Sequence, residues 1–320
     1  MKSIILAALA GVWIVLAGAA AAQDRASAPA GRMSAAELLR AADEGSVEAQ
    51  YAAAALILRG GMPENAAAFM RDPTRADGVA VGYLKNAASQ GSAAAQHLLG
   101  SLLLSGRGIG ADPLAAKDLF ARAAAAGNSD AQNAMGQMAR QGTGGARDYK
   151  AAVAWFEKAS AAGNMLALTN LAYMHGKGYG VPQNAEKAFA MTQRAASANV
   201  PEAQHNLGLM HYEGQGVSKN VMEALLWYRR AAEQGHSPSA LNIGFIYAKG
   251  EAGGDVRDQL VEAVKWFALA GTSKDARVGE KAKQAMLYVA KRVPPDVMLD
   301  GSAAAQKWML RRQANANLPQ

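Results

Sequence analysis

The chain has 320 residues, of which 51% are hydrophobic and only 6% aromatic, and its formal net charge is +7. Alanine supplies much of the hydrophobic fraction, so the composition favours closely packed helices over one thick core of large side chains. Cysteine is absent, which excludes disulfides, thiol nucleophiles and thiolate metal sites.

The first residues are typical of a secretory signal peptide. Lys2 carries a positive charge, residues 4–18 are apolar, and Ala20-Ala21-Ala22 is a small-residue cleavage site. We expect cleavage after Ala22, which removes residues 1–22; the alternative is an uncleaved anchor. The mature protein is then predicted to be periplasmic or secreted. It is also predicted to have no transmembrane segment, because no later stretch is apolar for long enough to span a bilayer.

Two short segments precede the main body of the chain. Residues 23–33 are predicted to be a flexible linker. Ser34-Ala35-Ala36-Glu37 is a capping-box pattern, in which the serine and glutamate side chains each accept a backbone hydrogen bond at a helix start. This pattern predicts a capping helix over residues 34–44.

A period of 36 residues dominates residues 45–271, which we divide into six copies. Each copy is predicted to form two helices, such as 203–212 and 223–233, because glycine permits the positive φ that ends a helix. One pair cannot bury its apolar stripe alone, so the pairs must stack. The recurring positions are Gly91, Gly127, Gly163, Asn199, Gly235 and Gly271, then Ala95, Ala131, Ala167, Ala203 and Ser239, then Gly100, Gly136, Ala172, Gly208 and Gly244, and then Gly106, Gly142, Gly178, Gly214 and Gly250.

The second helix of each copy has its own recurring residues. We expect its alanines to allow close helix contacts and its large side chains to fill the groove between pairs. The first copy has about ten extra residues in its loop, and the sixth gains three near 251–254. The alanines are Ala116, Ala152, Ala188 and Ala224, with Ala123, Ala159, Ala195 and Ala231, and the groove-filling column contains Trp155, Trp227 and Trp266.

The repeats resemble the Sel1-like repeat family, a relative of the tetratricopeptide repeats with a longer period. The likeness is carried by Ala203-Gln204-His205-Asn206-Leu207-Gly208, by Gly214-Gln215-Gly216-Val217, and by the run from Ala224 to Gly235. The resemblance implies an all-α fold, a superhelical α-solenoid of antiparallel helix pairs. We expect the array to be elongated and right-handed. Asn199, in place of a glycine, departs from the pattern.

Residues 272–320 are predicted to form a basic helical cap. Helices are expected over 276–292 and 302–313, separated by Pro294-Pro295 and Asp300-Gly301. Nine basic and four acidic side chains lie between residues 274 and 312. Lys307, Arg311 and Arg312 could therefore dock an acidic partner, an acidic glycan or anionic lipid headgroups; the alternative is a solvated cap that only keeps the end soluble.

Two further columns are candidate partner-binding positions. Asn170, Asn206 and Asn242 form an asparagine ladder on the first helices, where amides can bind a peptide backbone. The alternative is that each amide ties its helix to the adjacent pair. The neighbouring column varies in character, as a partner-reading surface would, and contains His97, Asn133, Thr169, His205 and Leu241.

The residues for catalysis are not grouped in any recurring pattern. The glycine loops, such as 176–180, join two helices and recur in every copy, so they are predicted to stop helices rather than bind phosphates. His175 and His211 occupy neighbouring copies, but a stable zinc site needs three or four ligands. We expect no catalytic activity, cofactor, metal or nucleic-acid partner.

The function expected from fold and compartment is a protein–protein interaction scaffold of the bacterial cell envelope or secreted space. One alternative is a cell-wall-related enzyme or β-lactam-binding protein, as the resemblance implies for some secreted relatives, although those carry cysteine pairs in each repeat. Another is a secreted host-facing binder.

Overall fold

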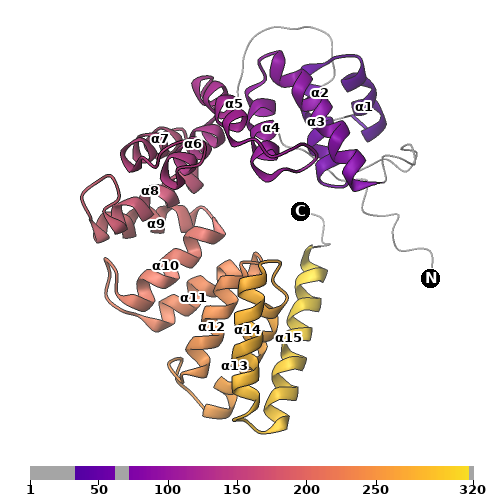
Figure 1. Cartoon of the computed structure of the whole chain (residues 1–320). Helices are drawn as coiled ribbons and strands as arrows, with labels where there is room; N and C mark the ends of the chain where they lie inside the picture. Colours follow the sequence, from indigo (N-terminus) through magenta and orange to yellow (C-terminus); the bar gives the residue numbers. More distant parts are fainter. Residues whose placement is uncertain (1–32, 62–71, 317–320) are drawn as a thin grey trace, which may run out of the picture. The chain divides into compact units, whose positions relative to one another are not determined.

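The computed structural model describes residues 33–61 and 72–316, and every regular element in this part of the chain is an α-helix (Figure 1). The predicted signal peptide, and the linker up to residue 32, lie outside the described residues. The chain forms two compact units, Met1–Ala162 and Gly163–Gln320. The helices are α1 Ala35–Asp43, α2 Val47–Leu58, α3 Pro73–Ser89, α4 Ala93–Ser105, α5 Pro113–Ala125, α6 Ser129–Gln141, α7 Tyr149–Ala161, α8 Met165–Lys177, α9 Ala185–Ser197, α10 Pro201–Glu213, α11 Val221–Glu233, α12 Ser237–Ala248, α13 Val256–Gly271, α14 Ala276–Ala290 and α15 Pro295–Ala316.

The first described helix, α1, spans Ala35–Asp43 and begins with a capping box at Ser34. The Ser34 side chain accepts a hydrogen bond from the Glu37 backbone, while the Glu37 carboxylate accepts one from the Ser34 backbone at 2.8 Å. Both partners of the capping box are thereby satisfied. Leu38 and Ala42 of α1 are buried against the start of α2.

The predicted helix pairs are confirmed. In the first unit α2 packs on α3, α4 on α5 and α6 on α7; in the second α8 packs on α9, α10 on α11 and α12 on α13. Left-handed glycines end α4, α6, α8 and α10, as expected from the glycine column. Asn199, with φ 63°, is the single non-glycine residue of the described chain with positive φ; asparagine tolerates this region better than most residues.

The glycines of the small-residue column in the first helices, Gly100, Gly136, Gly208 and Gly244, each make room for one ring. A Cβ atom added to Gly136 would lie 2.5 Å from the Phe156 ring, and one added to Gly208 would lie 2.8 Å from the Tyr228 ring. The fully buried rings are thus Phe120, Phe156, Tyr228 and Phe267, each one residue after the column that we predicted to fill the groove. Within that predicted column Trp266 is buried, whereas Trp155 and Trp227 are half-buried.

The second glycine of the loop after the first helix packs against the preceding repeat. A Cβ atom on Gly216 would lie 2.2 Å from the Ala185 carbonyl oxygen at the start of α9, and one on Gly108 would lie 2.8 Å from Asp77 of α3. Arg107, between two loop glycines, forms a bidentate ion pair with Asp77 at 2.8 Å. These loops therefore join consecutive repeats.

The C-terminal segment contains α14 and α15, and one of the breaks predicted in it is wrong. Asp300 and Gly301 lie inside α15, which continues from Pro295 to Ala316. A Cβ atom on Gly301 would lie 2.5 Å from Val264 Cβ, so this glycine lets α15 approach α13 closely instead of ending a helix. Both α14 and α15 pack against α13 (Figure 1).

None of the helices in residues 33–61 and 72–316 combines the length and apolar character that crossing a membrane requires.

Candidate binding site

The asparagine ladder lies on the first helices of three consecutive repeats. Asn170 belongs to α8, Asn206 to α10 and Asn242 to α12, and each side chain is half-buried. The Asn242 amide is hydrogen-bonded to the hydroxyl of Tyr228 in α11, which links it to the preceding helix pair. At this position the structural alternative is realised, and partner binding by the ladder stays a prediction.

The variable column beside the ladder points into the repeat packing. Asn133 is only 7% exposed, so it offers little surface to a partner. The His205 Nδ1 lies 2.9 Å from the Ser239 hydroxyl oxygen, and the His205 ring packs on Tyr228 at 5.3 Å between centroids. Burial, together with the neighbouring His236, lowers the pKa of His205 to about 4. His205 is therefore uncharged at neutral pH and contributes to the contact between two repeats.

A row of apolar side chains lies beside the asparagine ladder, and the sequence analysis did not identify it. Three residues after each asparagine, and hence on the same helix face, stand Tyr173, Leu209 and Phe245. Tyr173 is 41% exposed and Phe245 is 40% exposed, and Leu209 is half-buried. We call these three residues the apolar ladder. It could have been found from the sequence, because its members recur every 36 residues.

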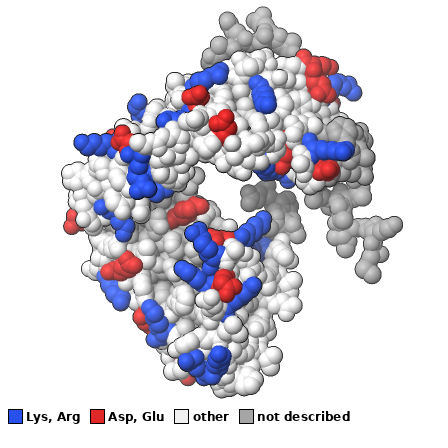
Figure 2. Space-filling model, viewed as in Figure 1, with Lys and Arg blue, Asp and Glu red and all other residues white. Residues whose placement is uncertain are grey.

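The basic residues of the cap lie at the surface. Lys307, Arg311 and Arg312 are all exposed on α15. Figure 2 shows basic side chains gathered over α14. Two of the cap's four acidic residues share one arginine of α13 instead of pairing with basic residues of the cap: Arg257 contacts Asp296 at 2.8 Å and Asp300 at 2.6 Å. The positive charge of the cap is therefore available to solvent.

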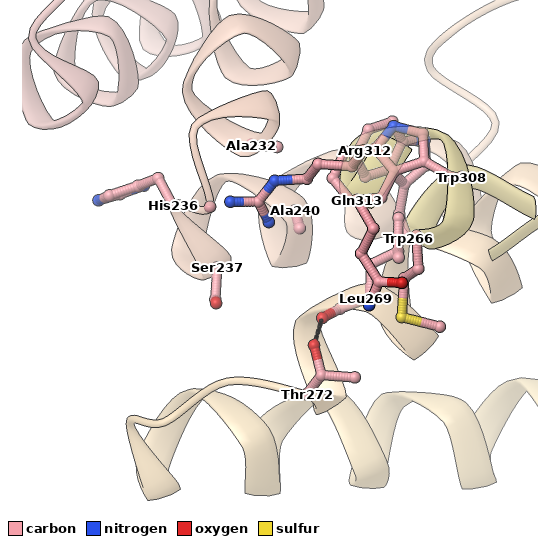
Figure 3. A pocket seen from close by; sticks show the side chains of 12 residues that line it. Ala232, His236, Ser237, Ala240, Trp266, Leu269, Thr272, Trp308, Arg312 and Gln313 are labelled. Atoms are coloured by element: carbon pink, nitrogen blue, oxygen red, sulfur yellow. Dashed lines mark hydrogen bonds between the residues drawn. The ribbon is translucent and has the colours of Figure 1, made fainter. Parts of the chain in front are cut away.

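A hollow of about 370 Å³ lies between α15, α13 and the turn that joins α11 to α12 (Figure 3). Trp266, Trp308 and Met309 form much of its apolar wall, and Arg312 extends across it from α15 toward His236. The Trp266 and Trp308 rings meet edge to face at 5.9 Å between centroids. The sequence placed Arg312 on a basic surface but gave no signal that two tryptophans 42 residues apart would meet beside it.

A second column overlooked in the sequence is structural. Gln50, Gln96 and Gln204 are buried, and each side-chain amide donates to a backbone carbonyl eight residues earlier, at 3.1–3.3 Å. These carbonyls belong to the last turn of the preceding helix, where the usual backbone donor four residues on is lacking and the residue three positions on donates instead. The glutamines therefore fasten α2, α4 and α10 each to the helix before it.

The histidines do not assemble with other ligand residues. Within the described residues, no group of three or more histidine, cysteine, aspartate or glutamate side chains is arranged to hold a metal ion. His175 and His211 are both buried, and the His211 ring packs edge to face on Phe189 at 5.4 Å.

The helix pairs stacked within each unit define a helix-pair repeat protein. Sel1 repeats match residues 93–128, 129–164, 166–200, 201–236 and 237–275, which is more than half of the chain. The chain belongs to the Sel1 repeat family. The first copy, 45–91, lies outside these matches, although α2 and α3 form its helix pair. Sel1 repeats commonly mediate protein–protein interaction.

Two solved structures show the same fold. A Sel1 repeat protein from Oxalobacter formigenes is 24% identical, with a TM-score of 0.62, and the match covers 76% of this chain and 96% of that one. A protective antigen present in uropathogenic Escherichia coli, described as displaying an SLR fold, is 25% identical with a TM-score of 0.55. That match covers 87% of this chain but 63% of the antigen's chain. No curated protein matches the chain.

Proposed function

We propose that this protein is a non-catalytic scaffold that binds other proteins outside the cytoplasm, as part of the bacterial cell envelope or secreted space. The observation that carries the proposal is the pairing of the asparagine and apolar ladders. On α8, α10 and α12 a half-buried amide and an apolar side chain recur together, three residues apart. Exposed aromatic and aliphatic side chains beside polar groups are the composition of a protein-binding surface.

The apolar ladder favours a protein partner because exposed apolar groups gain free energy when a partner removes them from water. Tyr173 and Phe245 belong to the first helices of their repeats, and each residue is still about two fifths exposed. Phe245 rests edge to face on the buried Phe267 ring at 5.1 Å. Such a side chain is held in place before binding, which lowers the entropy that binding must overcome.

Export is the second part of the proposal. It is supported by the positive charge of Lys2, by the apolar run over residues 4–18 and by the small residues that precede Gln23. One similar structure is of a protein described as a protective antigen. Fractionation with mass spectrometry of the purified chain tests this part: we expect a mature N-terminus at Gln23 outside the cytoplasm, and an uncleaved cytoplasmic chain would overturn it.

Site-specific photo-crosslinking tests the binding surface. A photoreactive phenylalanine analogue at position 173 or 245 is expected to capture a discrete partner in intact cells. Leu226, which is 43% exposed on the second helix α11, is the matched control position. Equal capture at position 226, or none at positions 173 and 245, would contradict the assignment of this face.

Turnover is tested separately. Purified protein is expected to leave cell-wall peptidoglycan and β-lactams unchanged. If the protein hydrolyses either substrate and one point substitution abolishes this activity, the protein is an enzyme and the scaffold proposal is wrong.

A further inference from the structure

The hollow at the C-terminal cap has a fixed apolar wall. Trp266 is only 3% exposed, and its indole nitrogen donates to a Glu262 carboxylate oxygen at 2.9 Å. Trp308 is half-buried and meets the edge of that indole from α15. A volume of about 370 Å³ is at the small end of ligand pockets. It suits one or two side chains rather than a folded element.

The rim of the hollow carries one cation without a carboxylate beside it. The Arg312 guanidinium lies 5.7 Å from the Trp308 ring centroid and so close to Gly235 that a Cβ atom there would be 2.6 Å from its Nη2. None of the residues that line the hollow is acidic. Among the described residues, the ion pairs involve other arginines and lysines, not Arg312.

An apolar wall beside an arginine that no carboxylate neutralises is complementary to an apolar group next to a negative charge. A planar guanidinium binds a carboxylate well, since its N–H donors match the two oxygens. An aromatic or long aliphatic side chain can pack on the tryptophans and on Met309.

We propose that the hollow binds an acidic segment of a partner protein, with one aromatic or long aliphatic side chain against Trp266 and Trp308 and a neighbouring Asp or Glu carboxylate on Arg312. The inference deepens the proposed function and rests on it. It assigns Arg312, rather than the basic surface as a whole, to partner recognition.

The test uses the mature chain and three synthetic peptides. The probe is acetyl-Ala-Asp-Phe-Glu-Ala-amide; one comparison peptide has Asn and Gln in place of Asp and Glu, and the other has Ala in place of Phe. Nuclear magnetic resonance of the indole N–H groups is the readout, with Trp155 of the first unit as internal reference. We expect the probe to shift the Trp266 and Trp308 signals in a saturable manner and to leave the Trp155 signal unchanged.

Both chemical features of the peptide are expected to matter. Removing either the carboxylates or the phenyl ring should weaken binding by roughly fivefold, as expected for a partly exposed ion pair or one packed ring. Arg312→Gln should lower the affinity for the acidic probe to the affinity measured for the neutral peptide. Arg311→Gln removes the same charge from an adjacent exposed position and should leave the affinity unchanged.

Several results would overturn the proposal. Among them are an absence of shifts at millimolar peptide, equal binding of the neutral peptide, and equal losses in the two arginine variants. Shifts produced by phosphatidylglycerol vesicles but not by peptide would assign the hollow to lipid. Binding seen only after deletion of residues 317–320 would assign it to the chain's own C-terminus, and a dimer lost in Arg312→Gln would assign it to a second copy. Photo-crosslinking at positions 173 and 245 is independent of these results, so either hypothesis can fail alone.

Discussion

The imidazole rings of His205 and His236 lie 4.7 Å apart between centroids, at the contact between two consecutive repeats. The Nδ1 atom of each ring is 2.9 Å from the same Ser239 hydroxyl oxygen. Ser239 is fully buried. Because a hydroxyl group both donates and accepts, one ring can accept a hydrogen bond from it while the other ring donates one to it. Protonation of both rings would place two positive charges side by side.

We therefore predict that acid destabilises this junction. Burial lowers the pKa of both histidines, to about 4 for His205, against a nearby Glu202 that raises the pKa of His236. Between pH 6.5 and 4 the unfolded chain binds more protons than the folded chain, so the free energy of unfolding falls as the pH falls. The shift at His205 corresponds to a loss on the order of 3 kcal/mol, measurable by chemical denaturation at constant ionic strength.

The control for this effect is His205→Gln, which keeps a polar side chain but cannot be protonated. Its stability should fall less steeply with pH than that of the parent. Part of the slope should remain, since burial also lowers the pKa of His97. Identical slopes in the two proteins would show that His205 does not carry the acid sensitivity.

The contact between Gly208 and Tyr228 predicts that the effect of Gly208→Ala on stability depends on the residue at position 228. Gly208→Ala would place a methyl group 2.8 Å from the Tyr228 ring and 3.1 Å from the Ala224 carbonyl oxygen. Overpacking typically costs about 1–3 kcal/mol, against a gain of roughly 0.5–1 kcal/mol from replacing a helical glycine. We expect a net loss of stability.

The chain itself suggests the rescue. Where the glycine column holds Ala172, the corresponding ring position holds Thr192. In a Tyr228→Thr background Gly208→Ala should be neutral or stabilising, which a double-mutant cycle measures. The same cost in both backgrounds would mean that the ring does not impose the glycine.

The alanine columns predict a second overpacking effect. Ala152 and Ala195 are both fully buried, so Ala152→Leu and Ala195→Leu should each lower the free energy of unfolding by about 1–3 kcal/mol. Ala154→Leu and Ala190→Leu, at exposed positions of the same two helices, are the matched controls. An unfolding midpoint unchanged by the buried substitutions would exclude a close helix contact there.

Gly301 predicts how the C-terminal helix is attached. Gly301→Ala should push α15 away from α13, because the added methyl would lie 2.5 Å from Val264 Cβ and 2.8 Å from the Val261 carbonyl oxygen. Hydrogen exchange within residues 295–316 should then become faster, whereas the exposed Ser302→Ala should have little effect. Slow exchange in both variants would place Gly301 outside this contact.

The repeat architecture could be predicted because each copy carries its own local signals. The glycines that end the first helices need positive φ, and the alanines at 95, 131 and 167 are needed where two backbones approach, so both recur at every 36th residue. The capping box at Ser34 is equally local, since its two partners are three residues apart. Such signals depend on neighbouring residues, and a single sequence displays them.

The features that could not be predicted depend on the packing of distant segments. The orientation of the second helix about its own axis decides which of two consecutive aromatic residues is buried. Phe156 and Tyr228 are fully buried, and the tryptophans before them are not. The sequence predicts a helix break at Gly301 because the contact of this glycine with Val264, 37 residues away, has no local signal.

The amino-acid sequence thus determined the helix pairs, their period and the close contacts within them, because these follow from backbone conformation and side-chain size at recurring positions. Only the tertiary structure decided that α15 is continuous, that Arg257 forms ion pairs with both Asp296 and Asp300, and that Trp266, Trp308 and Arg312 surround one hollow. These relationships arise where α15 returns onto α13, and the cap that makes this contact is not part of the repeating pattern.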